Sequence, residues 1–164
     1  MPDCRMLAVM GELLRKRLVS SRFEGVHQEA VLNLLVAHSH VRGILDGVFA
    51  GMDLTTTQYN VLRILNGAYP DGYPRGEIAR RMVERSPDLT RLIDRLVVRG
   101  LVERRRSRED ARKSIARITA RGRRMLASMH PLVRHATLDA AKCLTEREAA
   151  EFSRLCEKLY ADEM

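Results

Sequence analysis

Arginine and lysine crowd one stretch of the sequence, residues 99–124. Eleven residues there are basic, and three (Glu103, Glu109 and Asp110) are acidic. Like charges packed this densely repel one another, and a polyanion relieves that repulsion. An arginine fork can donate two hydrogen bonds to a phosphate, or to O6 and N7 of guanine. We therefore expect a phosphate-bearing partner here, rather than a merely solvated charged surface.

A helix and a pair of strands are predicted to present these charges. Leu89, Ile93, Leu96 and Val97 recur at helical spacing within residues 86–99, with charged residues on the other face. Gly100 stands where a C′ glycine ends a helix. A strand beginning at residues 101–102 then pairs with residues 114–118 across a charged hairpin. The pattern predicts an amphipathic helix followed by a basic β-hairpin.

Two motifs in this region resemble the MarR family of bacterial transcription regulators. They are T-R-x-x-D-R-L-x-x-x-G-L-V-E-R, residues 90–104, and D-x-R-x-x-x-x-x-x-T-x-x-G, residues 110–122. The resemblance covers roughly residues 23–160. It implies a mainly α fold with a small β-wing, in which a winged helix-turn-helix is flanked by dimerisation helices.

The resemblance also implies a division of the chain. Residues 1–22 are an N-terminal helical extension, within which the apolar spacing predicts a helix from Asp3 to about Val19. Residues 23–164 form the MarR-like domain. Within it, residues 54–119 are the DNA-binding lobe, and the dimerisation helices lie in residues 23–52 and 120–164.

Ten residues are candidates for contact with double-stranded DNA. Thr90, Arg91 and Arg95 fall on the exposed side of the predicted recognition helix, although Arg95 could instead pair with Asp94 or Glu103. The resemblance makes Arg112 the wing arginine that enters the minor groove and Asp110 the acid that orients it. The full set is Ser86, Asp88, Thr90, Arg91, Arg95, Arg106, Arg108, Asp110, Arg112 and Lys113.

A small-molecule site is expected beside the long helix predicted from Val26 to Phe49. Each helical glycine costs about 1 kcal/mol relative to alanine, so close helix approach or room for a ligand should offset Gly43 and Gly47. We expect a crevice between this helix and the helix after Thr119, floored by Tyr59. Its candidate residues are His38, Gly43, Gly47 and Tyr59. An aromatic acid or a phenol is the expected effector.

Several helix boundaries can be predicted from local chemistry. Thr55 with Gln58, and Thr145 with Glu148, match the capping box, and Thr119 begins a helix predicted to run to about Cys143. Ser86 and Pro87 suit the N-cap and first position of the recognition helix. Val83 and Glu84 depart from the usual helix-turn-helix pattern, which predicts a longer or differently shaped turn before that helix. Pro131 should kink its helix or end it early.

Composition sets the outer limits. The 164 residues are 45% apolar and 30% charged, with a net charge of +8 and a pI near 10.0, which indicates a globular protein with an acidic partner. Three widely spaced cysteines do not make a disulfide framework. No secretory signal or run of eighteen apolar residues is apparent. We expect a cytoplasmic protein with no membrane partner.

No cofactor, metal or catalytic residue is expected. His38 and His40 are two residues apart and His130 and His135 five apart, so neither pair shares a helical face. The sequence has no nucleophile elbow, no phosphate-binding loop and no H-E-x-x-H motif. Cys4, near Arg5, leaves oxidation sensing open. Cys143 and Cys156 are expected to be small core residues.

The predicted function is that of a sequence-specific, double-stranded-DNA-binding transcriptional regulator and not of an enzyme. The resemblance implies a ligand-responsive repressor that binds an inverted-repeat operator as a homodimer. Three alternatives remain: a protein that binds DNA without sequence preference, a winged-helix interaction protein, and a cysteine-based oxidation-sensing regulator.

Overall fold

The computed structural model describes residues 12–19, 23–84, 86–106 and 114–161. The chain divides into two compact units, residues 1–43 and 44–164. The first unit contains α2 (Glu12–Leu18) and most of α3 (Val26–Ala50). The predicted helix from Asp3 to about Val19 is described only from Glu12, and its earlier residues lie outside the described part of the chain.

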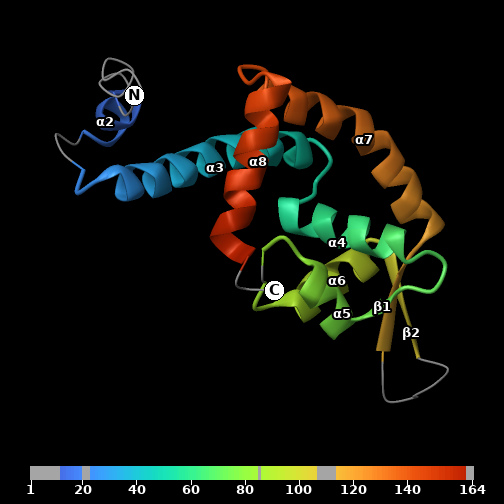
Figure 1. Cartoon of the computed structure of the whole chain (residues 1–164). Coiled ribbons are helices and arrows are strands. Elements are labelled where there is room, and N and C mark those ends of the chain that lie inside the picture. The colour runs from blue at the N-terminus through green and yellow to red at the C-terminus, as the bar shows by residue number, and fades with distance from the viewer. Residues whose placement is uncertain (1–11, 20–22, 85, 107–113, 162–164) are drawn as a thin grey trace. The chain divides into compact units, whose positions relative to one another are not determined.

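The second unit begins with the last turns of α3 and holds the remaining elements (Figure 1). Its helices are α4 (Thr56–Gly67), α5 (Arg75–Arg81), α6 (Leu89–Val98), α7 (Ala120–Ala140) and α8 (Glu146–Tyr160), and its strands are β1 (Tyr73–Pro74), β2 (Val102–Arg106) and β3 (Ser114–Ile118). The sheet is antiparallel, in the order β1-β3-β2. Helices α4, α5 and α6 pack beside it. The predicted mainly helical fold with a small β-wing is confirmed.

The core of this unit forms where α4 and α6 meet the strands. The largest fully buried apolar side chains come from five helices, the start of β2 and the residue before it: Phe49, Val61, Leu62, Leu65, Ile78, Leu96, Leu101, Val102 and Met129. Leu89 and Ile93 bury the same face of α6 as Leu96. Full burial of each such side chain contributes about 1.5–3 kcal/mol. The recognition helix predicted from apolar spacing therefore has one face fixed in the core.

Helix α6 ends in a Schellman motif. Gly100 adopts a left-handed φ of 68°. Its N–H donates to the carbonyl of Val97 at 2.8 Å, and the N–H of Leu101 donates to the carbonyl of Leu96 at 3.0 Å. The predicted glycine break is confirmed, and β2 begins two residues later.

The start of α6 differs from the prediction. The helix begins at Leu89, with Asp88 as the N-cap residue, so the expected roles of Ser86 and Pro87 as N-cap and first helical residue are wrong. Asp88 makes no side-chain capping bond, because its carboxylate pairs with Arg91 at 3.3 Å instead. Residues 82–88 separate α5 from α6, which confirms the longer turn. The N–H of Val83 anchors this connection by donating to Asn60 Oδ1 at 3.1 Å.

The other predicted helix starts are confirmed. Thr55 with Gln58, and Thr145 with Glu148, form complete capping boxes. Hydrogen bonds from the backbone N–H and the hydroxyl of Thr145 hold the pKa of Glu148 below its usual value. The Thr119 hydroxyl accepts from the N–H of Gly122 at 3.0 Å and donates to the carbonyl of Gly100 at 2.8 Å. Thr119 thus joins the start of α7 to the end of α6.

Two further predictions need correction. Helix α7 does not end at Pro131 but continues to Ala140, and it stops before Cys143. Cys143 is consequently exposed, in the connection to α8, and Cys156 is only partly buried, so neither is a core residue of this chain. None of the described helices combines the length and apolar character needed to cross a bilayer.

A glycine lets α7 approach the wing root closely. A Cβ at Gly122 would lie 2.3 Å from the Leu101 carbonyl oxygen and 2.8 Å from Ile118 Cγ1, whereas one at Gly76 would meet nothing within 4 Å. We predict that Gly122→Ala lowers the free energy of unfolding by about 1–3 kcal/mol through overpacking. Gly76→Ala, also in the first turn of a helix, should be neutral or stabilise by up to about 1 kcal/mol. Urea denaturation of both variants tests this, and equal effects would contradict it.

Candidate nucleic-acid interface

The outer face of α6 carries four exposed polar residues, Thr90, Arg91, Asp94 and Arg95. They stand opposite the buried Leu89, Ile93 and Leu96, so core packing fixes the direction in which they point. Arg91 pairs with Asp88 at 3.3 Å, but the two side chains are 79% and 53% exposed. Such a pair contributes no more than about 1 kcal/mol. The Arg91 guanidinium can therefore leave it at little cost.

Strand β2 continues this basic surface and is tied to α6. Arg104 Nη2 lies 2.8 Å from Asp94 Oδ1 and donates to the Thr90 carbonyl at 3.4 Å. Arg105 pairs with Glu103 at 2.9 Å. Both acids considered as partners for Arg95 are thus held by other arginines, and that alternative is wrong. Within the described part of the chain, Arg95 has no ion pair.

The structure brings six of the ten predicted DNA-binding residues into this region. Ser86 is partly buried just before α6, and Asp88, Thr90, Arg91 and Arg95 follow it with exposed side chains. Arg106 is exposed at the end of β2, opposite Ser114. The other four, Arg108, Asp110, Arg112 and Lys113, lie outside the described residues, and their roles stay predictions.

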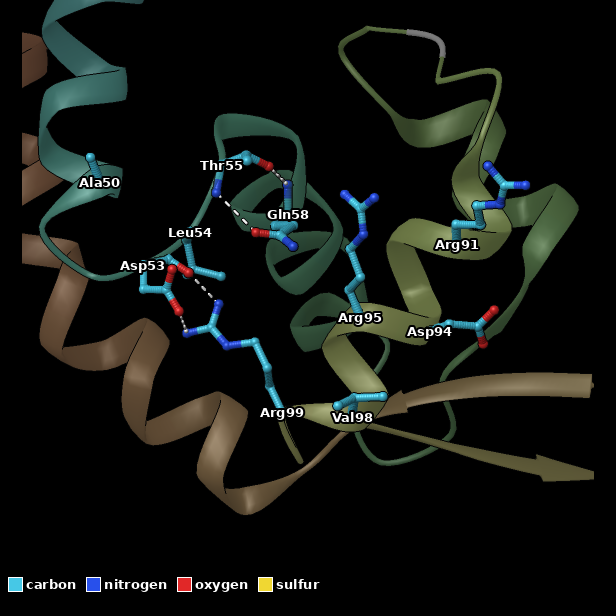
Figure 2. Close-up of a pocket in the computed structure, with 10 residues that line it drawn as sticks. All are labelled: Ala50, Asp53, Leu54, Thr55, Gln58, Arg91, Asp94, Arg95, Val98 and Arg99. Atoms are coloured by element: carbon cyan, nitrogen blue, oxygen red, sulfur yellow. Dashed lines mark hydrogen bonds and ion pairs between the residues drawn. The ribbon is translucent and has the colours of Figure 1, made fainter.

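A hollow of about 770 Å³ lies between α6, the start of α4 and the end of α3 (Figure 2). It is lined by Ala50, Asp53, Leu54, Thr55, Gln58, Arg91, Asp94, Arg95, Val98 and Arg99. Arg95 extends toward α4 in Figure 2, while Arg99 turns toward Asp53. Sequence reasoning assigned Arg99 no role beyond its charge, because no local pattern signals a contact with residues so distant along the chain.

A second hollow, of about 580 Å³, lies beside Tyr59. Its apolar wall includes Leu45, Phe49, Ile64, Met82 and Val133, and polar groups come from Thr56, Thr57, Asn60, Arg63 and Glu84. The rings of Phe49 and Tyr59 stack with centroids 4.6 Å apart. This hollow is bounded by α3, α4 and α7 and includes Tyr59, as predicted for a ligand crevice.

The other predicted ligand residues are placed differently. Gly47 does not line this hollow, and His38 and Gly43 belong to the first compact unit. Among the described residues, nothing lies within 4 Å of a Cβ built at Gly43 or Gly47, so no helix approaches them closely within this chain. The described residues contain no group of three or more His, Cys, Asp or Glu side chains placed to hold a metal ion.

Comparison with known proteins identifies the class to which this fold and surface belong. The family model described as MarR family matches residues 52–113. A MarR transcription factor from Planctomyces limnophilus is 36% identical, with a TM-score of 0.65, over 83% of this chain and 98% of that one. The chain therefore belongs to the MarR family of transcriptional regulators. None of the curated proteins compared with it matches.

More distant structures share the fold. Mutant MarR from Escherichia coli, in complex with operator DNA, is 24% identical with a TM-score of 0.70, over 92% of this chain and 97% of that one. Bordetella bronchiseptica BpsR, whose DNA binding is regulated by 6-hydroxynicotinic acid, is 21% identical with a TM-score of 0.71, over 80% and 98%. In this winged-helix fold β2 and β3 form the wing, and α6 is the helix that precedes it.

Proposed function

We propose that this protein is a sequence-specific repressor that binds an inverted-repeat operator in double-stranded DNA as a homodimer and responds to a small molecule. The observation that carries the proposal is the face of α6, where Thr90, Arg91 and Arg95 are exposed while the opposite face is fixed in the core. An α-helix fits the major groove, and arginine can read guanine there. No catalytic role is proposed for any residue.

The remaining predicted contacts complete a surface that fits a duplex. Arg106 extends the positive charge along β2, and Ser86 and Asp88 lie at the start of α6. We propose that Arg108, Asp110, Arg112 and Lys113 continue this surface, with Arg112 in the minor groove. Contacts to phosphates would orient the protein, and contacts to base edges would supply the sequence preference.

The last helix supports a homodimer. Four apolar or aromatic side chains recur on α8 at helical spacing, Phe152, Leu155, Leu159 and Tyr160, and they are 48%, 47%, 66% and 49% exposed. No residue of α8 is buried. An exposed apolar stripe on an amphipathic helix favours association with another protein surface. Most soluble oligomers are formed by copies of one chain, so a second copy is the expected partner. We assign the dimer interface to α8 and to the other dimerisation helices predicted in residues 23–52 and 120–164.

The hollow beside Tyr59 suits a small aromatic ligand. Its wall is mainly apolar, with a stacked aromatic pair and a few polar groups, which is the usual character of a ligand pocket. We propose that an aromatic acid or a phenol binds here and that Tyr59 forms part of the site. Such a ligand weakens operator binding only if it prefers the conformation that binds DNA less well.

We predict that selection from genomic fragments yields a DNA site with two-fold symmetry, with half-sites about 10 base pairs apart from centre to centre. Footprinting should show two equal protected half-sites. Sedimentation should give two chains per bound duplex. Uniform protection of unrelated fragments would instead indicate binding without sequence preference, and a monomer that protects a single half-site would contradict the dimer.

We predict that Arg91→Ala weakens binding to the selected site by about 1–3 kcal/mol, since the guanidinium can donate two hydrogen bonds to a base or a phosphate. Lys142→Ala removes the same charge from the connection between α7 and α8, where Lys142 pairs with Asp139 at 3.0 Å. It should bind like the parent. Fluorescence anisotropy at fixed salt measures both, and equal affinities of the two variants would remove Arg91 from the interface.

We predict that Ile64→Trp, which fills the hollow beside Tyr59 with a larger side chain, abolishes the response to ligand. In a screen of hydroxylated aromatic acids that includes 6-hydroxynicotinic acid, a compound that binds the parent should raise its melting temperature and weaken operator binding. The variant should show neither effect while retaining operator affinity. A variant that responds like the parent would place the ligand site elsewhere.

A further inference from the structure

The end of α6 is fastened to a distant part of the second unit by one side chain, Arg99. We propose that Arg99 is a positioning residue for DNA recognition: it holds the C-terminal end of the recognition helix against the connection between α3 and α4, and so sets the direction in which α6 presents its reading face. This inference rests on the proposed DNA binding, but the contacts behind it belong to the folded chain itself.

Arg99 makes three contacts with this connection, and Figure 2 draws those with Asp53. Its Nη1 donates to the carbonyl of Asp53, its Nη2 donates to the carbonyl of Met52 at 3.4 Å, and Nη2 also lies 3.4 Å from Asp53 Oδ2. The side chain of Arg99 is 27% exposed and that of Asp53 96% exposed. The contact to the Met52 carbonyl is part-buried, whereas the contacts to the carbonyl and the carboxylate of Asp53 are open to solvent.

The connection that receives Arg99 has a defined shape. The N–H groups of Met52 and Asp53 donate to the carbonyls of Phe49 and Ala50, each at 3.0 Å, and that of Leu54 donates to Phe49 at 3.0 Å. Asp53 takes a positive φ of 53°. The carbonyls of Met52 and Asp53 lie just beyond the last residue of α3, near the partial negative charge of its C-terminal end. A guanidinium is well suited to this place, because it supplies both donors and positive charge.

The other end of the contact is equally defined. Arg99 is the C-cap residue of α6, and Gly100 follows it in the Schellman motif. The carbonyl of Gly100 accepts from the Thr119 hydroxyl, the N-cap of α7. The ends of α3 and α6 and the start of α7 therefore meet around Arg99. A displacement of the end of α3 or of the start of α7 can therefore change the orientation of α6 through this junction.

Helix length converts a small tilt into a loss of fit. From Leu89 to Val98, α6 spans about 15 Å at 1.5 Å per residue. A tilt of about 5° at the Arg99 end moves the end that carries Thr90 and Arg91 by about 1 Å. A hydrogen bond to a base edge weakens steeply over such a displacement. Arg99 can thus affect sequence recognition without touching the DNA.

Arg95 provides the internal comparison. It lies one turn before Arg99 on the same helix and lines the same hollow, yet it has no ion pair among the described residues. Both arginines carry one positive charge, but only Arg99 is engaged with the connection between α3 and α4. Loss of Arg95 should remove a charge that is available to DNA, whereas loss of Arg99 should remove a constraint on the helix.

The dependence of affinity on salt separates these two roles. Each phosphate contact that is lost lowers the slope of log Kd against log salt by about one. On the DNA site selected by the parent, we expect Arg99→Met to bind about tenfold more weakly with an unchanged slope. Arg99→Lys, which keeps a charged donor, should recover part of the loss. Arg95→Met should bind more weakly with a slope lower by about one.

Hydrogen exchange supplies a readout that needs no DNA. Amide exchange should accelerate in residues 51–54 and at the end of α6 in Arg99→Met, and not in Arg95→Met. The milder Arg99→Gln, which keeps one amide donor, serves if Arg99→Met does not fold. Parent-like affinity, or a slope reduced by about one, in the folded Arg99 variants would overturn the inference. If the parent protein binds no DNA while amide exchange in Arg99→Met changes as expected, the proposed function is overturned. Arg99 is then a purely structural residue, and its role in recognition is overturned as well.

Discussion

The junction of α6, β2 and α7 depends on one backbone constraint, the left-handed conformation of Gly100. It allows α6 to end at Val98 and β2 to begin at Val102, and in this connection the Val97 and Leu96 carbonyls accept hydrogen bonds from Gly100 and Leu101. Any side chain there would be strained at a φ of 68°. Helix α6 and strand β2 consequently meet at Gly100, and Thr119 joins the start of α7 to this junction through its hydrogen bond to the Gly100 carbonyl.

The elements that could be predicted from the sequence are those defined by local chemistry. The spacing of Leu89, Ile93 and Leu96 located α6, Gly100 located its end, and threonines 55, 119 and 145 located three helix starts. Strand β3 has the predicted bounds, and its partner β2 begins two residues after the glycine. Each of these signals lies within a few residues of its effect.

The features that escaped prediction depend on long-range contacts or on competition between partners. Strand β1 has only two residues, and its pairing with β3 cannot be seen in any alternation of its own. Asp88 could have capped α6, but Arg91 competes for its carboxylate. At the candidate site, the exposed face of α6 followed from helical periodicity. The contact of Arg99 with the carbonyls of Met52 and Asp53 did not, since a backbone carbonyl leaves no trace in the sequence.

The pair formed by Arg91 and Asp88 has a consequence for how such a protein would search a chromosome. A chain with a net charge of +8 is attracted to any duplex, and that attraction delays its escape from wrong sites. Arg91 Nη1 lies 3.3 Å from Asp88 Oδ2, and both side chains are exposed. Asp88 is therefore an intramolecular partner for Arg91 when no DNA is bound. Random DNA must compete with that partner, whereas a guanine in the right place offers two hydrogen bonds in exchange. If Arg91 contacts a base as proposed, Asp88 would lower the affinity for random DNA more than the affinity for the correct site.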